Sequence, residues 1–112
     1  MTAKEVEAVV LGISPLERAM PGDPTGLLYG DPEIEVTGVA VTWTPTVQVL
    51  REAAVDGLNF VLTHEIPFFA SAKSNWFRTM PEEERPYNIA RRSILDAHGM
   101  AVCRCHSNWD GT

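Results

Sequence analysis

Near its middle the chain reads Leu58-Asn59-Phe60-Val61-Leu62-Thr63, a nearly continuous apolar run. Such a run is typical of a strand that is buried on both faces of a sheet. A helix is expected just before it, because Thr44-Pro45 combines an N-cap residue with a proline at the first helical position. Apolar residues then recur at helical spacing from Val47 to Ala54, and Gly57 follows them. These residues predict a helix that leads into a buried strand.

Two further strands are expected on either side of this unit. Residues 35–42 alternate and are rich in β-branched side chains, and residues 100–105 follow a glycine stop signal as a third strand. Residues 86–98 have the apolar spacing of a helix between the second strand and the third. Strand, helix, strand, helix, strand is the pattern of parallel strands joined by right-handed crossovers. The predicted fold class is therefore α/β, with a mostly parallel sheet and crossover helices.

The chain before these strands carries helix signals and then turn residues. Thr2 and Glu5 have the spacing of a capping box at the start of a helix, and Gly12 is expected to close that helix in a left-handed conformation. Ser14-Pro15 predicts the start of a second, short helix. The stretch 20–32, which is rich in proline and glycine, is expected to be a loop.

The composition limits the class of protein. The 112 residues suffice for one domain, and 45% hydrophobic and 21% charged residues are ordinary globular values. A formal net charge of −6 disfavours binding to nucleic acid or to an anionic membrane surface, because both require a basic patch. No apolar run approaches the roughly 18 residues that a membrane span needs. The polar amino terminus does not resemble a secretory signal.

Cysteine usage indicates a reducing compartment. The only two cysteines, Cys103 and Cys105, are separated by one residue, so a disulfide between them would be strained. We therefore expect a cytoplasmic protein. Both side chains point to the same face of the third strand, where they are expected to fill the core rather than to bind zinc.

Polar side chains follow two of the predicted strands. His64 and Glu65 come directly after the buried run, and His106 leaves the third strand with Asp110 four residues further on. Because the carboxyl ends of parallel strands meet at one edge of the sheet, these four side chains are expected to lie close together. Imidazole nitrogens and carboxylate oxygens are ligands for zinc, manganese or iron. The sequence therefore predicts a divalent-metal site of His64, Glu65, His106 and Asp110.

Other roles remain open for some of these residues. His64 could hydrogen-bond at the end of its strand, with Glu65 as a solvated loop charge. The aromatic-rich connection over 66–84 is expected to pack as a lid or against a partner. Its aromatic side chains, together with Trp43 and Trp109, could wall a pocket above the strand ends or pack in an interface or in the core. The sequence lacks the G-x-S-x-G elbow of serine hydrolases and the lysine of a phosphate-binding loop, which argues against those two mechanisms.

Several short motifs occur in a recognisable order along nearly the whole chain. They are Gly26-Leu27-Leu28-Tyr29-Gly30-Asp31-Pro32, then Thr44-Pro45 with its helix, then Thr63-His64-Glu65-x-Pro67, and finally His106-x-x-x-Asp110. In this order and spacing the chain resembles the Nif-three-like family, whose members are also called GTP cyclohydrolase I type 2-like or dinuclear metal-centre proteins.

The resemblance implies a module that binds two metal ions and assembles into a toroidal hexamer. It implies that His64 and Asp110 are metal ligands and that His106 stands in or beside the ligand set. Glu65 occupies a position where many members have a second histidine, a change that alters metal preference more than it abolishes binding. Thr42 stands where many members have an aspartate, which removes a charge from the site.

Two features separate this chain from full-length members of that family. The family's last motif, a histidine and a glutamate four residues apart near the carboxyl terminus, is not found, and full-length members are more than twice as long. Residues 1–112 are therefore expected to form a single amino-terminal Nif-three-like lobe, with a long aromatic loop over 66–84.

Two functions, and a combination of them, are compatible with these residues. The first is a divalent-metal-binding protein that acts as a metal-dependent hydrolase on a small, nucleotide-like substrate, with Glu65 as ligand or proton acceptor. The second is a non-enzymatic module with an incomplete metal site, which assembles with itself or binds a partner through the aromatic loop. In the combined arrangement, self-association of two lobes completes a site between chains.

Overall fold

The described part of the chain forms a sheet of four short strands. The computed structural model describes residues 1–68 and 86–110. The strands are β1 (Gly26–Tyr29), β2 (Val39–Thr42), β3 (Phe60–Thr63) and β4 (Ala101–Arg104). They lie in the order β1-β4-β3-β2, in which β2, β3 and β4 are parallel and β1 runs antiparallel to β4. The predicted α/β class with a mostly parallel sheet is confirmed.

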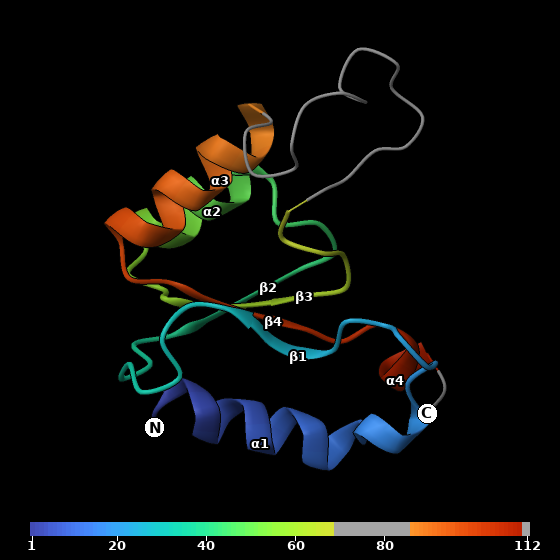
Figure 1. Cartoon of the computed structure of the whole chain (residues 1–112). Helices are drawn as coiled ribbons and strands as arrows, with labels where there is room; N and C mark the ends of the chain where they lie inside the picture. The colour runs from blue at the N-terminus through green and yellow to red at the C-terminus, as the bar shows by residue number, and fades with distance from the viewer. Residues whose placement is uncertain (69–85, 111–112) are drawn as a thin grey trace, which may run out of the picture.

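Helices cover both faces of this sheet (Figure 1). Helix α2 (Val47–Val55) follows β2, helix α3 (Pro86–Ala97) precedes β4, and the two lie together on one face. The other face carries α1 (Ala3–Ile13), the short 3-10 helix η1 (Leu16–Arg18) and the single-turn helix α4 (Ser107–Asp110). Within the part of the chain that the structure describes, no helix has both the length and the apolar character to cross a membrane.

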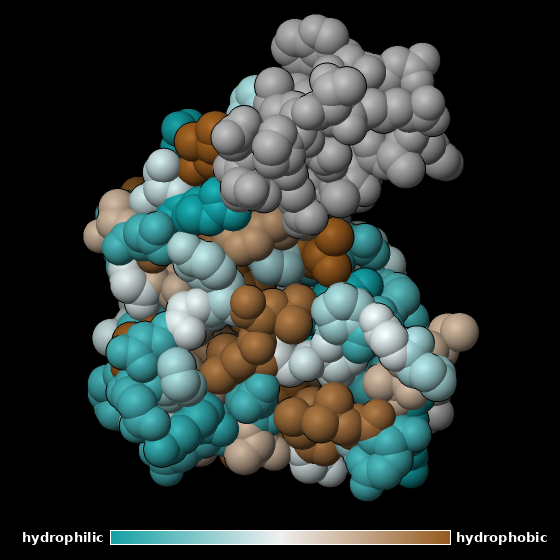
Figure 2. All heavy atoms as spheres, viewed as in Figure 1, coloured by the Kyte–Doolittle hydropathy of each residue, from teal (hydrophilic) through white to brown (hydrophobic). Residues whose placement is uncertain are grey.

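Among the described residues, two groups of buried apolar side chains hold these layers together. On the face of α2 and α3, Val61 and Val102 of the sheet pack against Leu50 and Leu95, and none of the four is more than 1% exposed. The group on the α1 face consists of Ala3, Phe60, Ala101 and Cys103. Successive side chains of β3 and β4 therefore point to opposite faces of the sheet. Because both faces are covered, the sequences of these strands are nearly continuously apolar. Apolar surface also shows between the layers at the β1 edge (Figure 2).

The prediction of a loop over residues 20–32 is wrong in its second half, because Gly26–Tyr29 forms strand β1. This segment lacks β-branched side chains and lies among glycines and prolines, so its sequence carries no strand signal. The pairing comes from β4 instead, where Cys103 is the partner of Leu27. Gly30 follows the strand with a φ of 98°, and a Cβ there would lie 2.6 Å from the Cα of Ala101.

Helix α1 starts as the sequence predicts and ends later. Thr2 Oγ1 accepts a hydrogen bond from the backbone N–H of Glu5 at 3.4 Å, and the Glu5 carboxylate accepts one from the N–H of Thr2 at 2.9 Å. The helix then runs through Gly12 instead of closing there, and Ser14 is its C-cap. Ser14 therefore ends α1 rather than starting η1, whose N-cap Pro15 makes no side-chain cap.

Strand β2 is shorter than predicted, and α2 starts later. The Asn59 side chain accepts a hydrogen bond from the N–H of Thr37 and donates one to the C=O of Glu35, so these backbone groups are bound before β2 begins. The N-cap of α2 is Thr46 and not Thr44, because Thr46 Oγ1 accepts the hydrogen bond from the first turn at 3.2 Å.

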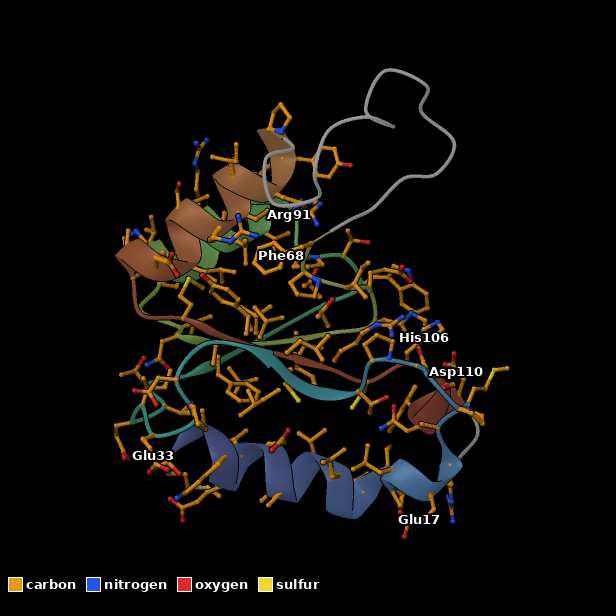
Figure 3. All side chains as sticks on the ribbon, viewed as in Figure 1. Glu17, Glu33, Phe68, Arg91, His106 and Asp110 are labelled. Carbon is orange, nitrogen blue, oxygen red and sulfur yellow. The ribbon has the colours of Figure 1, made fainter. Side chains whose placement is uncertain are left out.

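Most of the aromatic connection predicted over 66–84 lies outside the described residues. Phe68 is described, and its ring meets that of Tyr29 edge-on at a centroid distance of 5.0 Å. The guanidinium carbon of Arg92 lies 4.5 Å from the centroid of Phe68. Phe68 packs against the core group under α2 and α3 (Figure 3). This residue therefore closes the core on that face.

Candidate metal centre

The four side chains predicted to bind metal all lie at the carboxyl end of the parallel strands. His64 and Glu65 follow β3 directly, and His106 follows β4 after one intervening residue. Asp110 comes at the end of α4, where its backbone N–H donates to the C=O of His106 at 2.9 Å and closes one helical turn. Figure 3 shows His106 and Asp110 at the same end of the sheet.

His64, Glu65 and His106 form a cluster that could hold a metal ion. One potential ligand atom from each lies within 4.8 Å of those of the other two. His64 Nδ1 lies 3.1 Å from Glu65 Oε1, and His64 Nε2 lies 3.1 Å from Asp110 Oδ2. The side chain of His64 is 12% exposed, whereas that of Asp110 is 53% exposed. Asp110 therefore lies at the outer margin, in contact with His64 but outside the group of three.

Two carboxylates face the single imidazole ring of His64. A neutral imidazole has a single N–H, but both nitrogens of His64 face carboxylate oxygens, which only accept hydrogen bonds. At the nitrogen that carries no proton, the nitrogen lone pair faces a lone pair of the carboxylate oxygen. This contact is repulsive unless a second proton or a cation lies between the two atoms. A divalent cation bound by a His64 nitrogen and a neighbouring carboxylate removes this conflict. The donor set fits a metal ion, and its mixed nitrogen and oxygen atoms suit zinc, manganese or iron.

Behind the cluster lies Asp23, which sequence reasoning missed. Its Oδ2 accepts hydrogen bonds from His106 Nδ1 at 3.0 Å, from the N–H of Ser107 at 3.1 Å and from Ser107 Oγ. Its Oδ1 accepts one from Arg104 Nη1 at 2.6 Å. Asp23 lies in the segment before β1, at least 81 residues away from each of these partners. No local pattern marks such a contact, which depends on the pairing of β1 with β4.

Asp23 is ionised and fixes the orientation of His106. Burial opposes its ionisation, but the hydrogen bonds from Ser107, His106 and Arg104 outweigh burial and hold the pKa of Asp23 well below its usual range. Because a carboxylate only accepts hydrogen bonds, Nδ1 of His106 carries the proton, and Nε2 of the neutral ring keeps its lone pair. A carboxylate on the far nitrogen is the usual support of a metal-binding histidine.

Two contacts fix His64 in turn. Trp43 stacks on its ring with a centroid distance of 3.7 Å and an interplanar angle of 15°. Arg104 donates from Nε to the C=O of His64 at 3.0 Å, while its Nη1 holds Asp23. The Arg104 side chain is 7% exposed, so one buried guanidinium links the two histidine segments. The fold itself therefore sets the relative position of the two imidazoles.

Three other residues considered in the sequence lie outside the cluster of three. Thr42 Oγ1 donates to the C=O of Thr44 at 3.0 Å, so its hydroxyl serves the turn after β2. Cys103 is buried in the core as expected, and burial raises the pKa of its thiol to about 12. Cys105 is half-buried, and both thiols are free. The cytoplasmic location stays a prediction.

Parallel strands whose carboxyl ends present histidine and carboxylate side chains define an α/β domain with a candidate metal centre. More particularly, the chain belongs to the Duf34/NIF3 (NGG1p interacting factor 3) family, whose sequence model matches residues 1–112. The resemblance drawn from the short motifs is thereby confirmed.

The curated relatives that match this chain are much longer than it. A "GTP cyclohydrolase 1 type 2 homolog" of Lactococcus lactis subsp. lactis (strain IL1403) is 32% identical over 96 residues, which are 86% of this chain and 35% of that protein. A protein of the same name from Staphylococcus aureus (strain COL) is 29% identical over 96 residues, which are 86% of this chain and 24% of that protein. The chain therefore spans about a quarter to a third of the length of these relatives.

Solved structures share the fold. The crystal structure of Staphylococcus aureus protein SA1388 matches with a TM-score of 0.79 and 27% identity, over 98% of this chain and 29% of that one. Reduced HcgD from Methanocaldococcus jannaschii matches with a TM-score of 0.79 and 24% identity, over 98% of this chain and 41% of that one. The second likeness shows the fold alone.

Proposed function

We propose that this chain binds a divalent metal ion through His64, Glu65 and His106, and that the ion serves the hydrolysis of a small substrate. The observation that carries the proposal is the conflict at His64, whose two nitrogens both face carboxylates. The names of the curated relatives, which are GTP cyclohydrolase homologs, support a hydrolytic reaction and a nucleotide-like substrate. A second metal ion would need ligands beyond these three side chains.

The residues of the cluster have separate tasks in this proposal. A divalent cation, when bound, acts as a Lewis acid and lowers the pKa of water. His106 offers Nε2, because Asp23 holds its Nδ1. His64 offers a nitrogen from a ring that Trp43 keeps in place. Glu65 has a side chain that is 38% exposed, so its carboxylate is placed to act as a ligand or to accept a proton from solvent.

Metal titration tests the site directly. Calorimetric titration of chelator-treated protein with zinc chloride should show binding. His64→Ala and His106→Ala should each weaken it about tenfold or more, because each removes a ligand atom. His98→Ala is the matched control, since His98 is exposed and precedes β4 at the opposite end of the sheet. The assignment is wrong if both variants bind zinc as tightly as the parent protein does.

Hydrolysis needs a separate measurement. Zinc- or manganese-loaded protein should release product from at least one member of a panel of nucleotides and phosphoesters that includes GTP. Glu65→Gln should lower kcat about a hundredfold if Glu65 accepts the proton. A matching loss of metal affinity in calorimetry would instead make Glu65 a ligand. Metal binding without turnover across the whole panel would refute the hydrolase and leave a metal-binding protein.

A self-associating module is the second candidate function, and an exposed apolar edge favours it. Strand β2 is one of the two outer strands of the described sheet; its Val41 is 76% exposed, and Trp43, directly after the strand, is 65% exposed. Edge strands with apolar side chains are templates for pairing with another chain. A hexamer, and a site completed between two lobes, belong to this proposal. In size-exclusion chromatography with light scattering, an oligomer that Val41→Glu dissociates would support it, and a monomer at every concentration would refute it.

A further inference from the structure

Beside the candidate metal centre, the α1 side of the sheet contains a cavity of about 450 Å³. Ala3 of α1 packs on β4 and on Phe60, the first residue of β3. The part of the sheet next to this contact, which consists of β2 and the end of β3, borders the cavity. Small-molecule sites typically have volumes of about 300–1,000 Å³, so the cavity has a suitable size. Its apolar wall consists of Val10, Ile13, Val41, Trp43, Leu62 and Trp109.

Ser14 lines this cavity and carries an unpartnered polar group. The residue is 1% exposed, and within the described residues its Oγ makes no hydrogen bond. Its backbone is fixed, because its N–H donates to the C=O of Val10 at 3.0 Å and its C=O accepts from Asn108 Nδ2 at 2.9 Å. Burying a hydroxyl without a hydrogen bond is unfavourable, and native proteins seldom retain such a group without a reason. Among the described residues, therefore, the Ser14 hydroxyl lacks a hydrogen-bond partner at the edge of the cavity.

The chemistry of the wall limits what the ligand is. The described residues that line the cavity include neither Lys nor Arg, and the net charge of the chain is −6. A triphosphate needs cationic partners, so this wall disfavours it. The indoles of Trp43 and Trp109 favour a planar ring instead, because aromatic rings stack on one another or meet edge-on. His64 belongs both to the cavity wall and to the metal cluster, so a bound molecule would lie next to the ion site.

We propose that the cavity binds an uncharged, planar aromatic molecule with one hydroxyl or carbonyl group, which hydrogen-bonds to Ser14 Oγ while the ring contacts Trp43 and Trp109. The inference is separate from the proposed function, because the cavity lies beside the ion site but its wall disfavours the nucleotide-like substrate proposed there. Association of a second copy with strand β2 would account for the exposed Val41 and Trp43 but not for the buried hydroxyl of Ser14. A small molecule accounts for all of these residues together.

Titration of chelator-treated protein with p-cresol and with toluene tests the cavity without metal. The two compounds share a ring and a methyl group and differ by one hydroxyl. In two-dimensional NMR, both should shift the indole N–H signals of Trp43 and Trp109, and p-cresol should bind about three- to tenfold more tightly. Ser14→Ala should remove this preference and change the affinity for toluene by less than about twofold. Ser93→Ala, on an exposed position of α3, should change neither affinity.

A second variant tests the wall of the cavity. Val10→Glu should weaken both compounds about tenfold or more, because Val10 is half-buried on α1 and a carboxylate in this part of the wall must lose its hydration when a ring binds. The proposal is overturned if neither compound shifts the indole signals, or if Ser14→Ala leaves the preference for p-cresol intact. It is also overturned if GTP binds here more tightly than p-cresol, or if sedimentation shows a dimer that Val41→Glu converts to a monomer.

The two proposals fail separately. Binding of p-cresol without any binding of zinc would refute the metal-dependent function and leave the cavity ligand. Binding of zinc without any binding of p-cresol would refute the cavity ligand alone.

Discussion

Two groups of carboxylate and histidine side chains adjoin one another at the end of the sheet, and their charges are balanced differently. In the inner group, Asp23 is 13% exposed and faces Arg104, which is 7% exposed, together with donors from His106 and Ser107. In the outer group, two carboxylates that are 38% and 53% exposed both face the single ring of His64.

The difference indicates which group is structural and which is available to a ligand. Every oxygen of Asp23 is matched by donors from the chain, so the inner group has no capacity left for a cation. In the outer group two partly exposed carboxylates face one imidazole ring, and oxygen and nitrogen atoms with access to solvent are what a cation site requires. His106 belongs to both groups, because Asp23 holds one of its nitrogens and the other is left for the metal cluster. The inner group therefore holds the His106 ring in the position from which its other nitrogen faces the outer group.

The largest effect should come from breaking the inner group. Asp23→Asn leaves Arg104 buried without its counter-charge, and we expect the free energy of unfolding to fall by about 3–5 kcal/mol. Urea unfolding followed by circular dichroism measures this change. Asp56→Asn, an exposed position at the end of α2, is the control with the same change of charge and should alter stability by less than about 0.5 kcal/mol. A cost below 1 kcal/mol for Asp23→Asn would show that the inner group is not structural.

Acid should weaken the inner group by a smaller amount. The pKa of Asp23 is lowered in the folded state, so its contribution to stability is complete above the unfolded pKa of about 4 and is lost as the pH falls below that value towards the folded pKa. Between pH 7 and pH 3 the free energy of unfolding should fall by about 1 kcal/mol on account of this residue. Urea unfolding at both pH values, in the parent and in Asp23→Asn, measures the share that depends on Asp23. If Asp23→Asn is too unstable for this comparison, NMR titration of the Asp23 carboxyl carbon in the parent protein gives its pKa directly. An ordinary pKa for Asp23 would contradict the prediction.

Much of the outer group could be predicted from the sequence because its signals are local. His64, Glu65 and His106 each follow an apolar run that predicts a strand, and parallel topology then places strand ends together. Asp110 is reached by one helical turn from His106. The same periodicity predicted the α/β class, since buried strands and amphipathic helices have different apolar spacings.

The inner group and the cavity depend on contacts between distant segments, which no spacing in the sequence reveals. Asp23 lies in a stretch whose prolines and glycines suggest only turns, and strand β1 forms there because β4 offers it a partner. Ser14 has the sequence context of a helix N-cap, yet its hydroxyl is buried at the end of α1. In both places a long-range contact outweighs the local preference.

The smallest change in stability should come from the outer group. Asp110→Asn removes one of the two carboxylates beside His64, but the Asp110 side chain is 53% exposed, so the free energy of unfolding of the metal-free protein should change by no more than about 0.5 kcal/mol. The affinity for zinc should nevertheless fall, because a negative charge leaves the surroundings of the ion, whereas Asp56→Asn should leave it unchanged. Urea unfolding and zinc calorimetry on the same samples separate the two effects. A loss of stability as large as that of Asp23→Asn, with unchanged zinc affinity, would make Asp110 a structural residue and remove the distinction between the two groups.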